Sequence, residues 1–151
     1  MKSSRSGIFE AFAGWPVWVA ALWWGSLTTL AFGVVPLLFI HLPSKSLAGN
    51  TAASLFGVQA LASVLFGVAL LLASSGRVMA HYSARAQSAR GVVLAGMLLA
   101  LLVEFAVAPR IVARQNLPLW HAVGTLMLLA QWVCAGISFW FLVKPASQDQ
   151  V

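Results

Sequence analysis

The sequence predicts an all-α protein, a bundle of four transmembrane helices, on the basis of its composition and of its apolar segments. Of the 151 residues, 61% are hydrophobic and only 8% are charged, whereas a soluble domain carries about 25% charged residues. The mean hydropathy is +0.91. Four apolar stretches separated by short polar connectors are each long enough to cross a bilayer, which takes about 20 residues.

The first apolar stretch is the longest, because no charged residue occurs between Glu10 and Lys45. It exceeds the roughly 7–15 apolar residues of a signal-peptide core, so we expect an uncleaved helix over 15–40 that follows a cytoplasmic head at 1–14. Indole rings favour the head-group boundary. This boundary is where we expect the tryptophans near the helix start, Trp15, Trp18, Trp23 and Trp24.

The remaining helices are expected at about 50–73, 91–113 and 118–143, followed by a cytoplasmic tail at 144–151. Asn50 or Thr51 is a candidate cap for the second helix, since both side chains can accept a hydrogen bond from the first turn. The connector at 74–90 is rich in Ser, Ala and Arg, and it suits either a short interfacial helix or a loop. The four helices form a single domain over 15–143.

Small residues at helical spacing predict where helices approach closely in lipid. Gly25, Thr29 and Gly33 recur every fourth residue and so share one face of the first helix. Gly96 occupies a similar face of the third helix, the face that also carries Glu104. Pro36 has no amide N–H, which predicts a kink near the end of the first helix. The expected helix-packing residues are therefore Gly25, Thr29, Gly33, Pro36 and Gly96.

The basic residues predict the orientation in the membrane. If both termini lie on one side, that side holds six bases, and the other side holds Lys45, Arg110 and Arg114. The positive-inside rule then places both termini in the cytoplasm of a cell membrane, the inner membrane in a bacterium. We expect the basic loops to face anionic lipid head groups. Because the bases are spread over all loops, we expect no nucleic-acid surface. The six bases are Lys2, Arg5, Arg77, Arg85, Arg90 and Lys144.

Glu104 is the one acidic residue inside a predicted span, and an ionisable group there is costly enough to suggest a function. It should face the bundle interior. It is a candidate proton or cation site, and the alternative is a structural hydrogen bond or an ion pair with Arg110. For Arg110, snorkelling to the head groups is the other expectation. The candidate polar cluster on the outer side comprises Glu104, Arg110, His121, His41 and Gln131.

Metal, cofactor and enzyme chemistry are not expected. Two histidines with a carboxylate could bind a transition metal, and His41 with His121 could ligate a haem iron. Neither set has a sequential ligand motif behind it. The sequence shows no Ser/His/Asp set, no Gly-rich phosphate loop and no paired carboxylates. The single Cys134 excludes an internal disulfide and is expected to be a small apolar packing residue.

Several short motifs, taken in order, resemble the transmembrane-protein-205-like family of small membrane proteins, a domain of unknown function. The resemblance covers roughly 15–143 and implies a membrane location and four helices, without a settled biochemical role. Members often place Gly and Ser directly after the helix-four histidine and an Asn later, whereas here Ala122 follows His121 and Leu128 stands in place of the Asn. The motifs are Trp24-Gly25, Phe32, Pro36 and Phe39, then Ala48-Gly49 and Leu55-Phe56, then Pro109-Arg110 and His121.

These observations lead us to expect a non-enzymatic membrane protein that acts by helix association, as a subunit or accessory of a larger membrane complex. Its partners would be a second copy of the chain or other membrane proteins. An alternative is a small transporter or ion-handling protein that uses Glu104 with Gln131 and His121. A further alternative is a protein that binds haem or a metal ion.

Overall fold

The computed structural model describes residues 14–75 and 84–143, and every regular element in those ranges is helical. Four helices are long and apolar enough to cross a membrane: Trp15–His41, Lys45–Ser74, Ala89–Val112 and Leu117–Val143. The predicted fold class is confirmed, and the chain is a multi-pass membrane protein. The predicted head up to residue 13, the predicted tail and four of the six bases assigned to the cytoplasmic side lie outside the described residues.

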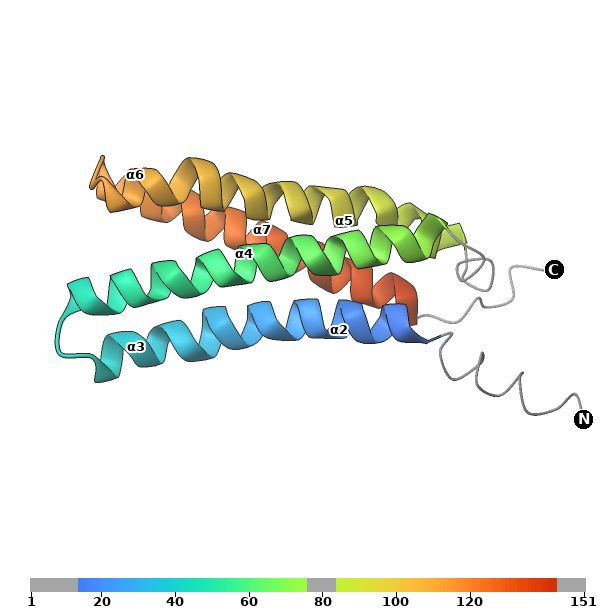
Figure 1. Ribbon diagram of the computed structural model, residues 1–151, viewed down its shortest axis with the longest axis horizontal. Helices are drawn as coiled ribbons and strands as arrows, with labels where there is room; N and C mark the ends of the chain where they lie inside the picture. The colour runs from blue at the N-terminus through green and yellow to red at the C-terminus, as the bar shows by residue number, and fades with distance from the viewer. Residues whose placement is uncertain (1–13, 76–83, 144–151) are drawn as a thin grey trace, which may run out of the picture.

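The spans run up and down in chain order (Figure 1). Figure 1 shows that α2 begins and α7 ends at the same end of the bundle as the α4–α5 connection, with the other two turns at the opposite end, called here the α3–α4 end. Both α2 and α5 pack against α4 and α7. The elements are α2 (Trp15–Thr28), η1 (Thr29–Val34), α3 (Val35–His41), α4 (Lys45–Ser75), α5 (Ala84–Leu102), η3 (Val103–Val107), α6 (Ala108–Val112) and α7 (Leu117–Val143), where η marks a π-helical segment.

Two helix starts differ from the sequence-based expectation. The second span begins at Lys45 rather than near Asn50, because the Ser44 hydroxyl accepts a hydrogen bond from the Leu47 N–H at 3.2 Å and caps the helix. The expected cap at Asn50 is therefore wrong, and Asn50 lies inside α4. The helix that leads into the third span, α5, begins at Ala84, within the connector for which an interfacial helix and a loop were both open.

Each of two spans contains a π-helical segment that ends just before a proline. The Val35 N–H donates to the Leu30 carbonyl before Pro36, and the Ala108 N–H donates to the Val103 carbonyl before Pro109. Because proline has no N–H to donate to the carbonyl four residues back, a wider turn takes up the interruption. The kink expected near Pro36 therefore takes the form of a π turn, and Pro109 is preceded by another.

The half of the bundle near the α4–α5 connection is tightly packed. Trp23 is fully buried, and a Cβ atom added to Gly96 would lie 2.9 Å from its Cη2 atom. Trp24 packs against Gly136 and stacks on Phe139 with ring centroids 5.9 Å apart. Both rings therefore fill space between helices, and their position at the head-group boundary stays a prediction.

The small-residue face of the first span is not covered by another helix of this chain. A Cβ atom added to Gly25 or Gly33 would meet nothing within 4 Å, and Thr29 and Pro36 are exposed. The close helix approach expected at these positions is therefore absent within the chain, whereas Gly96 does lie against Trp23. A small-residue face allows close contact, but the sequence does not say which helix supplies it.

We predict that Gly96→Ala lowers the free energy of unfolding by about 1–3 kcal/mol, because the added methyl group overpacks the Trp23 contact. Gly25→Ala is the matched control and should leave stability unchanged or raise it by up to about 1 kcal/mol, through helix propensity alone. Thermal unfolding of purified protein in detergent, followed by circular dichroism, measures both variants. Equal stability of the two would contradict the packing described for Gly96.

Candidate functional site

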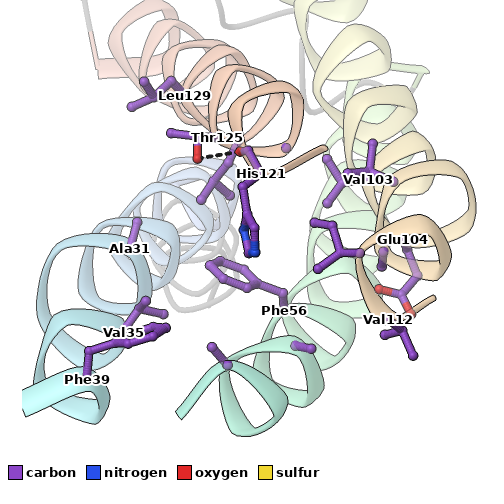
Figure 2. Close-up of a pocket in the computed structure, with 18 of the residues that line it drawn as sticks. Ala31, Val35, Phe39, Phe56, Val103, Glu104, Val112, His121, Thr125 and Leu129 are labelled. Atoms are coloured by element: carbon purple, nitrogen blue, oxygen red, sulfur yellow. Dashed lines mark hydrogen bonds between the residues drawn. The ribbon is translucent and has the colours of Figure 1, made fainter. Parts of the chain in front are cut away.

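The half of the bundle toward the α3–α4 end contains a cavity of about 340 Å³ (Figure 2). Its wall is drawn from all four spans: η1 and α3, the first part of α4, η3 with α6, and the first part of α7. Every lining residue belongs to one of the membrane-spanning segments, so the cavity lies at membrane depth. Small-molecule sites in proteins have volumes of about 300–1,000 Å³, and this cavity falls within that range.

The course of the helices and their small side chains explain why space remains here. Beyond the π turns, α3 packs against α4 and α6 packs against α7, and Figure 1 shows the two pairs diverging toward the α3–α4 end. Side chains of one carbon or none then line much of the wall, so the widened gap is not filled. These residues are Ala31, Gly49, Ala52, Ala53, Ala108 and Gly124.

The wall is mainly apolar and carries three polar side chains. Thr125 is already engaged, because its hydroxyl donates to the His121 carbonyl at 2.8 Å. The Glu104 carboxylate and the His121 ring make no hydrogen bond or ion pair with another residue in the ranges 14–75 and 84–143. Figure 2 shows them on different walls, with Glu104 on η3 and His121 on α7, its ring directed toward Phe56. Both side chains are therefore available to a molecule in the cavity.

Gly57 makes room for the carboxylate of Glu104. A Cβ atom at Gly57 would lie 3.3 Å from Glu104 Oε1 and 3.5 Å from Oε2, so the carboxylate rests against bare backbone of α4. Glu104 is half-buried and faces the bundle interior, as a costly ionisable group in a membrane should. Sequence reasoning did not connect Gly57 with Glu104, because the two residues lie on different helices.

Arg110 does not join Glu104. Its Nη1 atom donates to the Ala106 carbonyl, and its guanidinium lies over the Trp120 ring, 4.6 Å from the centroid. This cation–π contact spans the turn between α6 and α7. Arg110 is exposed and does not line the cavity. Sequence reasoning missed Trp120, although an arginine and a tryptophan on either side of a short turn could have suggested the contact.

His41 also lies outside the cavity. It is the exposed last residue of α3, and only His121 of the two candidate ligands lines the wall. In the part of the chain that the structure describes, no three residues among His, Cys, Asp and Glu are placed to hold a metal ion. The structure does not assemble the histidine pair considered for a haem or metal ion.

Gln131 belongs to a separate buried network that joins three spans. Its Nε2 atom donates to Ser63 Oγ at 2.8 Å, and Gln59 Nε2 donates to Ser26 Oγ at 3.0 Å. Ser63 Oγ in turn donates to the Gln59 carbonyl at 2.8 Å. None of these residues lines the cavity. The expected grouping of Gln131 with Glu104 is therefore not formed, and Gln131 holds α7 to α4.

These features define a class of protein, a multi-pass helical membrane protein whose bundle contains a mainly apolar cavity with one carboxylate. The model of a family described as a domain of unknown function (DUF4149) matches residues 18–118, more than half of the chain. The chain belongs to this family. Comparison with curated proteins and with solved structures gives no match. The resemblance to the transmembrane-protein-205-like family stays a prediction.

We predict that Ser63→Ala lowers the free energy of unfolding by about 1–3 kcal/mol, because it leaves the buried Gln131 amide without its acceptor. The matched control is Ser54→Ala. Ser54 is an exposed serine on the same helix, with only a hydrogen bond to the Asn50 carbonyl, so its loss should cost little. Chemical or thermal unfolding in detergent compares the two. If both variants have the same free energy of unfolding as the wild type, the network does not stabilise the fold.

Proposed function

We propose that this protein binds a small, mainly apolar molecule inside the membrane and acts as a small transporter or membrane binding protein, without enzyme chemistry. The cavity is the observation that carries the proposal. It has a suitable volume, an apolar wall drawn from four spans, and two polar side chains, Glu104 and His121, that no described residue satisfies. A concave apolar site with a few convergent polar groups is the usual form of a small-molecule site. The proposal needs no metal ion and no haem.

The exposed part of the wall supports entry from the side of the bundle. Phe32 on η1 is 57% exposed and Leu129 on α7 is 41% exposed, and His121 and Thr125 are also exposed. All four line the cavity. Nearer the tightly packed half, the rings of Phe32 and Trp132 pack edge to face with their centroids 5.8 Å apart. This contact closes the gap between the first and fourth spans there. In a membrane, this opening faces lipid, from which an apolar molecule could enter directly.

We further propose that the protein lies in a cell membrane, the inner membrane if the organism is bacterial, with both termini in the cytoplasm. The distribution of basic residues supports this orientation, since six of the nine fall on the side assigned to the termini. The start of α2 and the end of α7 lie at the same end of the bundle (Figure 1). In this orientation, the cavity lies in the outer half of the membrane.

The proposed binding is tested by blocking the cavity. Ala53 lines the wall and its neighbour Ser54 is exposed and does not line it, so Ala53→Phe and Ser54→Phe form a matched pair. An apolar diazirine photoprobe in lipid vesicles should label cavity residues such as Phe56 and Leu128. We predict that Ala53→Phe lowers this labelling about tenfold, which corresponds to about 1.4 kcal/mol, and that Ser54→Phe leaves it unchanged.

Labelling of Leu22, a lipid-facing residue that is 60% exposed, provides the internal standard, because every variant should show it equally. Adducts are located by mass spectrometry of the digested protein. The proposal is wrong if cavity labelling does not exceed what lipid exposure explains, or if Ala53→Phe and Ser54→Phe behave alike.

Helix association as an accessory subunit is the second candidate function. The uncovered face at Gly25 and Gly33 favours it, because nothing in the described chain lies within 4 Å of a Cβ atom added there. In lipid, such a face allows close contact with a second copy of the chain. This function and ligand binding are compatible, since the cavity and this face use different residues.

We predict that the double variant Gly25→Leu/Gly33→Leu lowers self-association in lipid vesicles, because the added side chains keep two helices apart. Gly91→Leu is the control, since Gly91 on α5 is exposed and equally free of neighbours. Energy transfer between labelled copies is measured as the protein is diluted in lipid, which gives an apparent affinity of self-association. This affinity should fall about tenfold for the double variant and stay unchanged for Gly91→Leu. Energy transfer no greater than chance in the wild type would exclude this association.

A further inference from the structure

We propose that the cavity selects an organic cation, an ammonium or related group attached to an apolar body, with the Glu104 carboxylate as its counter-ion. This inference rests on the proposed function, because it names the class of molecule that the cavity binds. Three observations carry it: the charge of the wall, its aromatic side chains and its shortage of oxygen ligands.

Glu104 is the only charged residue in the wall when histidine is counted as neutral. The described bases lie elsewhere. Arg110 is held over Trp120 and to the Ala106 carbonyl, and Arg90 donates to the Ser74 carbonyl near the α4–α5 connection. Within residues 14–75 and 84–143, the structure pairs no cation with the Glu104 carboxylate. An ionised carboxylate in a low-dielectric site is strongly disfavoured without such a partner, so a bound cation would be favoured there.

Aromatic rings complete the recognition of a cation. Phe32, Phe39 and Phe56 all line the cavity, and the face of an aromatic ring attracts a positive charge, as in sites that bind quaternary ammonium groups. Apart from His121 and Thr125, the remaining wall is aliphatic. A cation with an apolar body would therefore match the wall in charge and in hydrophobicity.

The wall does not suit a small inorganic cation. Calcium takes about 6–8 oxygen ligands, and magnesium requires near-ideal octahedral oxygen coordination. The side-chain oxygens of this cavity belong to Glu104 and Thr125, and the Thr125 hydroxyl is bonded to the His121 carbonyl. A strongly hydrated ion would lose most of its water without replacement ligands. An organic cation keeps its charge spread over apolar groups and needs no such set.

Gly57 positions the carboxylate. The distance of 3.3 Å from a Cβ atom at Gly57 to Glu104 Oε1 is tight enough that an alanine would push the carboxyl group back by a few tenths of an ångström. Gly57→Ala therefore keeps the charge of the site and changes its position, whereas Glu104→Gln keeps the shape and removes the charge. The two variants separate the role of charge from the role of packing.

The test uses two probes of the same shape, benzyltrimethylammonium and its neutral carbon isostere, neopentylbenzene. Each competes with the apolar photoprobe for the full-length protein in zwitterionic lipid nanodiscs at mildly alkaline pH. For each probe we measure the concentration that halves cavity labelling, and we take the ratio of the value for the neutral probe to the value for the cation. Because each probe partitions into lipid equally for all variants, comparing this ratio between variants cancels the partitioning. We expect Glu104→Gln to weaken the preference for the cation at least about tenfold, with the neutral probe unaffected.

Gly57→Ala should weaken the cation preference in the same direction, and Ala53→Phe should weaken both probes together. Thermal unfolding checks each variant, and Gly57→Ala decides the matter if Glu104→Gln does not fold. If both probes still protect the cavity and the ratio is unchanged in the variants at Glu104 and Gly57, the inference is overturned and the proposed binding stands. If neither probe protects the wild-type cavity and Ala53→Phe changes nothing, the proposed binding fails, and the inference fails with it.

Discussion

The whole structure depends on one constraint, that a chain in lipid must satisfy its backbone hydrogen bonds internally. Pro36 and Pro109 each remove a backbone donor near the end of a span. A wide π turn precedes each proline, and the helix continues through it without a break. These turns lie where the helix pairs begin to diverge, and residues from both η1 and η3 line the cavity. Continuous hydrogen bonding and an open interior are therefore achieved together.

The two halves of the bundle use small residues in opposite ways. Near the α4–α5 connection, Gly96 and Gly136 receive the rings of Trp23 and Trp24, so the absence of a side chain is filled by a large neighbour. Toward the α3–α4 end, Ala52 and other small residues line the gap and do not fill it. Whether a small residue creates contact or space depends on what stands opposite, and the backbone course decides that.

The spans and the inward direction of Glu104 could be predicted because the cost of polar groups in lipid determines both. The partners of Arg110 and Gln131 and the position of His41 outside the cavity could not. They depend on the rotation of each helix about its axis, and a π turn changes that rotation partway along a span. Hydropathy does not contain this information. Trp23 shows the same limit, because its contact with Gly96 depends on which helix stands opposite.

The buried network of Ser26, Gln59, Ser63 and Gln131 has a consequence for the direction in which the cavity can be reached. It ties α2, α4 and α7 together between the cavity and the packed tryptophans. A molecule in the cavity could not continue toward the α4–α5 connection unless these hydrogen bonds separated. In this conformation, the network closes the cavity on the side of the α4–α5 connection, and no channel runs through the described part of the bundle. A ligand that enters beside α3 and α7 would leave by the same route unless this hydrogen-bonded network rearranges.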